Sequence, residues 1–204
     1  MTAKHTTRRA QSAEQTRALI LRAALERFTA DGYAKATVQD IARTAGVVVA
    51  TVYTSVGGKP VLLEQLVRAG VEGAVVAQTM ERVARATGGR EIVELIAEGT
   101  GHSYRENRDV IGLLLTTAVH EPVAHQLLAE ATVAYRGALA VAAARLHEVG
   151  GLADGIDVVR ATDVLWYFFG IHSWFRLHSG AEWSDEEAAA WLAETAVRAL
   201  CPAE

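Results

Sequence analysis

The chain has one cysteine, three prolines and little strand-type alternation among its 204 residues. Cys201 cannot form a disulfide within its own chain, which favours a reducing compartment such as the cytoplasm. The longest uncharged apolar run, residues 164–171, is eight residues long, whereas a membrane-spanning helix needs about 20. No apolar stretch follows the charges at the N-terminus, so no secretory signal is expected. These absences predict a soluble, cytoplasmic protein.

The composition indicates a folded, helical chain. Hydrophobic residues make up 50% of the sequence and charged residues 22%, which excludes a disordered chain. Abundant Ala, Leu, Glu and Arg, with few prolines, predict an all-α fold of about nine helices. The expected helices cover about residues 13–30, 38–45, 49–55, 60–85, 91–105, 108–120, 122–147, 157–178 and 184–200.

The net charge of −4 hides two regions of opposite sign. Residues 1–60 hold nine Lys or Arg and four Asp or Glu, a net charge of +5. Residues 61–204 hold 11 Lys or Arg and 20 Asp or Glu, a net charge of −9. A basic N-terminal quarter on an acidic remainder favours contact with a polyanion such as nucleic acid. An ordinary fluctuation in surface charge explains the same numbers, so charge alone does not decide.

Two short predicted helices flank the turn Ala45-Gly46-Val47, and Thr37 is placed to cap the first of them. Helices that meet at a steep angle need small residues in the turn, so that their backbones can approach. This layout is typical of a DNA-reading helix–turn–helix, in which the second helix enters the major groove. A generic helical hairpin has the same small turn, so the turn alone does not separate the two interpretations.

The residues around this turn carry a more specific signal. Thr16–Tyr33 (TRALILRAALERFTADGY) and Ala36–Val47 (ATVQDIARTAGV) resemble the first two helices of the TetR family of transcriptional regulators. Thr51-Val52-Tyr53, and Lys59 with Leu62-Leu63, complete the pattern, which extends over about residues 12–72. The acidic remainder fits that family's variable effector-binding and dimerisation domain.

The resemblance implies three parts. Residues 1–12 form a flexible basic arm, in which Lys4, Arg8 and Arg9 either reach toward a minor groove or act as a solubilising tail. Residues 13–58, with the start of the fourth helix to about residue 72, form the helix–turn–helix DNA-binding domain. Residues 59–204 form the effector-binding and dimerisation domain.

The resemblance also implies function. It predicts a repressor, less often an activator, that binds double-stranded DNA at a palindromic operator as a homodimer. The half-sites are then about 34–36 Å apart. The effector is expected to be a small, largely apolar molecule that releases the protein from DNA. No cofactor and no metal site are expected. The DNA-contacting residues implied by position are Thr37, Gln39, Arg43, Val48, Val49, Thr51, Tyr53, Thr54 and Lys59.

Two positions depart from the family pattern. Members often carry polar residues where this chain has Val48 and Val49, and an aromatic pair where it has Ser55-Val56. Valine cannot hydrogen-bond a base edge, but it can pack on the methyl group of thymine. The departure therefore favours half-sites that contain A·T pairs.

The segment 157–178 is apolar almost all round, so it must be buried on most sides. With the last helix it resembles the family's two-helix dimer surface, whose isologous pairing makes a four-helix bundle. Burial in the core of one protomer is the alternative. The predicted dimer residues are Ala161, Leu165, Phe168, His172, Phe175, Ala188, Leu192, Ala196 and Ala199.

An effector pocket is expected among the middle helices. Polar and aromatic side chains there suit a mostly apolar small molecule with a few polar groups. The candidate lining residues are His102, Tyr104, Thr116, Thr117, His120, Tyr135, Trp166 and Phe169.

Two other function classes are less consistent with the sequence. An enzyme is disfavoured because His120 and His125 in HEPVAH are five residues apart with Pro122 between them, so they cannot share a helix face as zinc ligands. Gly57-Gly58-Lys59 lacks the frame of a phosphate-binding loop. The second class, a helical ligand-binding or interaction module that does not bind DNA, is disfavoured by the basic N-terminal region.

Overall fold

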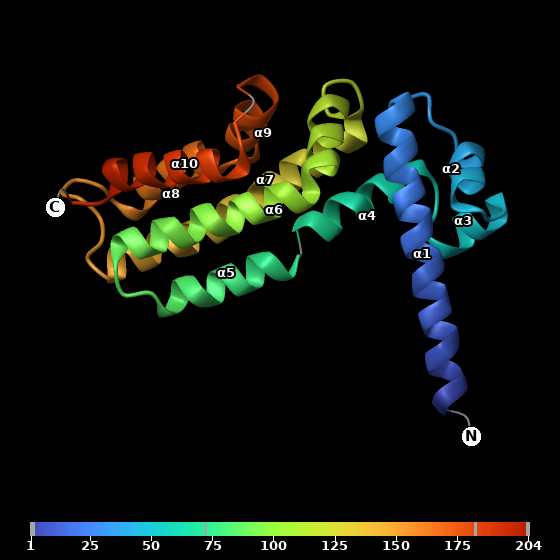
Figure 1. The fold of residues 1–204 in the computed structure, drawn as a ribbon, viewed down its shortest axis with the longest axis horizontal. Helices are drawn as coiled ribbons and strands as arrows, with labels where there is room; N and C mark the ends of the chain where they lie inside the picture. The colour runs from blue at the N-terminus through green and yellow to red at the C-terminus, as the bar shows by residue number, and fades with distance from the viewer. Residues whose placement is uncertain (1–2, 72, 182, 203–204) are drawn as a thin grey trace. The chain divides into compact units, whose positions relative to one another are not determined.

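The computed structural model describes residues 3–71, 73–181 and 183–202, and this part of the chain is helical without strands. This confirms the predicted all-α fold (Figure 1). The helices are α1 (Ala3–Asp31), α2 (Val38–Ala45), α3 (Val49–Ser55), α4 (Lys59–Val71), α5 (Ala74–Arg85), α6 (Gly89–Thr117), α7 (Pro122–Glu148), α8 (Val158–Phe169), α9 (Ile171–Gly180) and α10 (Asp185–Leu200).

The helices form two compact units. The N-terminal unit comprises the chain up to Ala69 together with Gly112–Leu128. The C-terminal unit comprises Gly70–Ile111 and the chain from Ala129 onward. The segment Gly112–Leu128 was expected in the effector domain, but its contacts group it with the first four helices. Sequence order alone could not show this, because the grouping depends on contacts between distant segments.

The N-terminal unit has its own small core. α1 packs on α2 and α3, and the contact buries one apolar stripe of α1 while its other faces stay exposed. Phe28 packs against Tyr33 with ring centroids 5.0 Å apart. The fully buried side chains of this core are Ile20, Ala24, Ile41, Val52, Leu62 and Leu63.

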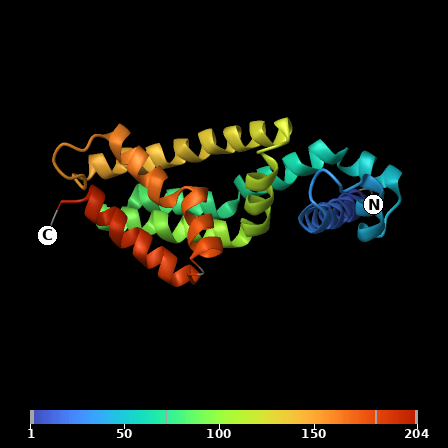
Figure 2. The same cartoon turned by 90° about the horizontal axis from the view of Figure 1, so that it is seen from above.

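In the C-terminal unit, ion pairs show how the helices pack. Arg82 on α5 pairs with Glu98 on α6 at 2.9 Å, and Arg90 on α6 pairs with Glu194 on α10 at 3.1 Å. α6 therefore lies between α5 and α10. α8 and α10 lie side by side in both views (Figures 1 and 2). The large, fully buried side chains between these helices are Ile92, Ile96, Leu139, Leu146, Leu165, Phe169 and Trp174.

Four helix boundaries differ from the prediction. α1 begins at Ala3 rather than about Ala13, because residues 3–12 contain no glycine or proline to stop a helix. The predicted helix 60–85 is split into α4 and α5, with Gly73 as the N-cap of α5. The predicted helices 91–105 and 108–120 are one helix, α6, since Glu106 and Asn107 do not interrupt it.

The fourth difference is the break of the predicted helix 157–178 into α8 and α9 at Gly170. Gly170 has extended backbone angles, φ −64° and ψ 155°. A Cβ atom at this position would lie 2.5 Å from the carbonyl oxygen of Trp166, so the bend requires glycine. A hydrophobic pattern continues through the bend, which explains why the sequence predicts a single helix.

α7 is long and apolar enough, by length and composition, to cross a membrane. A single helix of this kind is weak evidence for a membrane span, because long helices of soluble proteins meet the same criterion. Arg136, in the middle of α7, donates to Asp163 of α8 at 2.5 Å. This contact ties the centre of α7 to a neighbouring helix of the same unit.

Candidate DNA-binding interface and ligand cavity

The two short helices α2 and α3 are set by local signals. Thr37 caps α2, as predicted, and its hydroxyl oxygen accepts from the backbone N–H of Asp40 at 3.1 Å. Gly46 ends α2 with a left-handed backbone, φ 69°, which glycine adopts at little cost. Its N–H and that of Val47 donate to the carbonyls of Arg43 and Ala42 at 3.2 and 3.0 Å. These bonds satisfy the end of α2 and turn the chain directly into α3.

α3 presents most of its surface to solvent. Val52 is its one buried side chain, whereas Val48 is 70% and Tyr53 56% exposed. Thr54 is also exposed, as predicted, while Val49 and Thr51 are half-buried. Ala50, which is not among the predicted DNA-contacting residues, is exposed as well. A helix anchored by one valine and otherwise open has the form that a groove-reading helix needs.

The expected phosphate-contacting residues differ in their availability. Thr37, Gln39 and Arg43 are exposed on α2. The Lys59 ammonium, in contrast, donates to the carbonyl of Ala34 at 3.1 Å and lies 4.6 Å from the ring centroid of Tyr33. Lys59 therefore already has partners within the N-terminal unit.

The Tyr33 phenol is affected by its burial and by a charge in the segment 112–128. Burial raises the pKa of the Tyr33 phenol, and the negative charge of Glu121 raises it further. The phenol is therefore neutral at physiological pH. The side chains of Lys4, Arg8 and Arg9, the expected arm residues, lie outside the described part of the chain, although α1 begins at Ala3.

The C-terminal unit holds a small cavity of about 30 Å³ between α5, α6 and α7. Burial raises the pKa of the Tyr135 phenol well above its ordinary value, and a hydrogen bond with Thr100 partly offsets this. The Tyr135 hydroxyl donates to the carbonyl of Phe169 at 2.7 Å. The cavity is lined by Val76, Thr79, Met80, Ile96, Gly99, Thr100, Ser103, Tyr135, Ala138 and Leu139.

Only Tyr135 among the predicted pocket residues lines this cavity. Trp166 packs edge-on against the Tyr135 ring, with ring centroids 5.7 Å apart. The Phe169 carbonyl accepts the hydrogen bond from the Tyr135 hydroxyl. Tyr104 is buried elsewhere, stacked on Trp174 at 6.1 Å.

The remaining predicted pocket residues lie apart from the cavity. His102, Thr116 and His120 are exposed and Thr117 is buried. Thr116, Thr117 and His120 belong to the segment grouped with the N-terminal unit. The sequence does not reveal the cavity, because most of its lining residues are aliphatic or small. The repeat of small residues at Gly99 and Ser103 on one face of α6 was the available signal.

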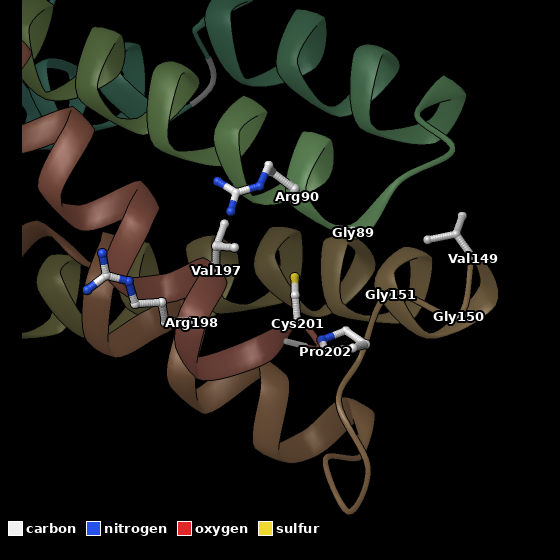
Figure 3. A pocket seen from close by; sticks show the side chains of 9 residues that line it. All are labelled: Gly89, Arg90, Val149, Gly150, Gly151, Val197, Arg198, Cys201 and Pro202. Carbon is white, nitrogen blue, oxygen red and sulfur yellow. The ribbon is translucent and has the colours of Figure 1, made fainter. Parts of the chain in front are cut away.

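A wider hollow of about 430 Å³ opens at one end of the C-terminal unit (Figure 3). It is lined by Gly89, Arg90, Val149, Gly150, Gly151, Val197, Arg198, Cys201 and Pro202. Glu194 accepts from both Arg90 and Arg198 at 3.1 Å, which lowers the pKa of its carboxyl. Burial raises the pKa of the Cys201 thiol, so the thiol is protonated at neutral pH and is a weak nucleophile.

The predicted dimer face is wrong at five positions. Ala161, Leu165, Ala188, Leu192 and Ala196 are all at most 1% exposed and form part of the protomer's own core. Hydrophobic periodicity does not tell whether the same protomer or a second copy covers an apolar face. The bend at Gly170 also breaks the predicted stripe, because His172 and Phe175 lie on α9. His172 and Ala199 are exposed, and Phe168 and Phe175 are half-buried.

Comparison with known proteins agrees with this architecture. Residues 20–66 match the family of bacterial regulatory proteins of the tetR family. NalD, the secondary repressor of the MexAB-OprM multidrug efflux pump in Pseudomonas aeruginosa, has a similar structure. Its TM-score is 0.74 at 22% identity, over 95% of this chain and 100% of NalD. No curated protein sequence matches the chain.

Two further solved structures share the fold and carry ligands. The SmeT–triclosan complex has a TM-score of 0.74 at 19% identity, over 92% of each chain. FadR of Bacillus subtilis with stearoyl-CoA has a TM-score of 0.70 at 18% identity, over 88% of this chain and 96% of FadR. The family match on residues 20–66 and the shared fold support a TetR-family transcriptional regulator. Such regulators are DNA-binding transcription factors and not enzymes.

Proposed function

We propose that the chain is a ligand-responsive repressor that binds a palindromic operator as a homodimer. The α2–α3 turn supports the proposal: Gly46 joins a capped helix to a short helix whose one buried side chain is Val52. α3 enters the major groove, and Thr37, Gln39 and Arg43 hold the DNA backbone. The site of action is the cytoplasm, where the DNA is.

Base reading falls to the exposed residues of α3. Val48 packs on thymine methyl groups, while Tyr53 and Thr54 offer hydroxyls to phosphate or base edges. The half-buried Val49 and Thr51 contribute at the edge of the contact. Lys59 reaches phosphate only after leaving the Ala34 carbonyl.

The homodimer forms through the outward faces of α8 and α10. Tyr167 is 73% and Trp191 47% exposed, and Trp191 packs edge-on against Trp183 at 5.5 Å. Large aromatic side chains on a surface mark a protein interface more often than isolated small apolar ones do. Isologous pairing of this face covers the aromatic side chains of both copies.

The effector is a small, largely apolar molecule that enters the cavity beside Tyr135. About 30 Å³ holds little more than one water, so binding must widen the space between α5, α6 and α7. α6 lines the cavity at Ile96, Gly99 and Thr100 and also supplies residues of the N-terminal unit. An effector that binds better to a displaced α6 therefore shifts the DNA-binding equilibrium. The SmeT and FadR structures contain triclosan and stearoyl-CoA, and triclosan and the stearoyl chain have this apolar character.

Selection of binding sites from random DNA tests the operator. The expected result is an inverted repeat with half-sites about one helical turn apart and with A·T pairs beneath Val48. A gel shift with the selected duplex should weaken steeply as salt rises. Absence of binding to any duplex at low salt would falsify the proposal.

Sedimentation of the wild type and of Tyr167→Arg tests the dimer. The wild type should sediment as a dimer, and the variant as a monomer with unchanged helical content. A monomeric wild type contradicts the homodimer.

A thermal-shift screen tests the effector. Apolar compounds that raise the Tm should also release DNA, and Ala138→Trp, which fills the cavity, should abolish both effects.

A further inference from the structure

Within the proposed DNA-backbone site, the Asp40 carboxylate already accepts hydrogen bonds from Thr37 and Arg43. The Thr37 hydroxyl donates to Oδ2 of Asp40 at 2.5 Å. The Arg43 guanidinium pairs with Oδ1 of the same carboxylate. Thus both oxygens of Asp40 are occupied by the side chains expected to contact phosphate.

This arrangement places a negative charge at the surface that faces DNA. The side chain of Asp40 is 30% exposed and that of Arg43 is 79% exposed. The hydrogen bond from Thr37, reinforced by Arg43, lowers the pKa of the Asp40 carboxyl. Asp40 is therefore charged at neutral pH, and it acts on an approaching phosphate as a like charge.

We propose that Asp40 limits the non-specific DNA affinity of this regulator by competing, as an intramolecular carboxylate, with DNA phosphate for Thr37 and Arg43. The proposal rests on the DNA-backbone role given to these residues above. In free protein the carboxylate holds both donors. On the operator, base contacts from α3 supply the free energy that transfers them from Asp40 to phosphate.

Specificity is the consequence. Phosphate contacts supply essentially all of the non-specific affinity and carry no sequence information. On random DNA, which makes no base contacts, the donors stay with Asp40 and their phosphate contacts are not made. On the operator, base contacts from α3 hold α2 against the DNA backbone, and the donors transfer to phosphate. Asp40 is thus a specificity-determining residue that touches no base.

The Asp40→Asn variant tests this role. It keeps the size of the side chain and removes its charge, which leaves Arg43 free for phosphate. Binding of the full chain to a random-sequence duplex is measured by fluorescence anisotropy over a range of salt concentrations. At low salt the variant should bind about threefold to tenfold more tightly than wild type, and the salt slope should steepen by about 0.9.

Glu64→Gln is the matched control. Glu64 pairs with Arg68 at 2.9 Å on α4, so this variant also removes one acid from an acid–arginine pair on a helix of the same unit. Its affinity and salt slope should equal those of the wild type. In the double variant Asp40→Asn/Arg43→Gln, the gain should disappear.

The outcomes separate this proposal from the proposed function. If Asp40→Asn binds random DNA no more tightly than Glu64→Gln while the wild type binds its operator, the role of Asp40 is refuted and the repressor proposal stands. If the wild type binds no duplex, both fail. Asp40 also stabilises the start of α2, so thermal unfolding is followed in parallel. Should Asp40→Asn unfold, Asp40→Ser, which also lacks the charge, must show the same gain in affinity.

Discussion

The two units of this regulator obtain their structure in different ways. In the N-terminal unit, short helices begin and end at recognisable residues, Thr37 and Gly46, and α3 is held by the single buried side chain of Val52. In the C-terminal unit, long helices bury broad apolar faces, and the break at Gly170 lies within a continuous hydrophobic pattern. The comparison teaches that local signals specify the helix–turn–helix, whereas packing specifies which faces of the longer helices are buried and which are exposed.

The largest expected effect contrasts a buried aromatic residue with an exposed one. Trp174, 2% exposed in the C-terminal unit, stacks on Tyr104, so Trp174→Ala should lower the free energy of unfolding by about 3–5 kcal/mol. Tyr53→Ala, at a 56% exposed position on α3, should change stability by at most about 0.5 kcal/mol while weakening DNA binding. Urea denaturation and anisotropy measure the two effects. Equal losses of stability would break the comparison.

Two glycines sharpen the contrast between a packed position and an open one. Gly170→Ala places a Cβ atom against the Trp166 carbonyl, so it should cost about 1–3 kcal/mol. Gly137→Ala, in α7 with nothing within 4 Å of the added atom, should stabilise the chain by about 0.5–1 kcal/mol. Differential scanning calorimetry measures both changes. A stabilising Gly170→Ala would mean that α8 and α9 can join.

Helix caps allow a like-for-like test across the two units. Thr37 caps α2, and Ser184 caps α10 in a reciprocal pair of bonds with Glu187. Replacement of either cap by alanine should cost about 1 kcal/mol, seen as a lower midpoint of urea unfolding. Only Thr37→Ala should also weaken operator binding, because its hydroxyl is placed at the DNA surface. A similar loss of DNA binding from Ser184→Ala would contradict the division between the units.

The smallest expected effect is a pH dependence in the C-terminal unit. The hydrogen bond from Arg82 lowers the pKa of Glu98, so the stabilisation from this pair is present above the ordinary pKa of Glu, about 4.3, and is lost as pH falls below it. Arg82→Gln should remove this part of the acid sensitivity. The effect is small, since both side chains are more than half exposed and solvent screens the pair. Thermal unfolding between neutral and acid pH, with Arg198→Gln for comparison, measures it.

The sequence predicts the first unit better than the second for a physical reason. Caps and turns act within four or five residues, so Thr37, Gly46 and Ser184 could be assigned from the sequence, and the structure confirms them. The dimer stripe failed because Ala161, Leu165 and Leu192 are apolar in either setting, and periodicity does not say which partner covers them. The cavity residues other than Tyr135 were not predicted for a similar reason. Aliphatic and small side chains do not distinguish a cavity lining from an ordinary core.

The sequence by itself determined the helical class, the basic N-terminal region and the helix–turn–helix, because these depend on composition and short-range spacing. The tertiary structure decided that Gly112–Leu128 groups with the first helices, that the chain bends at Gly170, and that Asp40 binds both Thr37 and Arg43. Each of these depends on which atoms come within contact distance. The order of residues along the chain does not specify those distances.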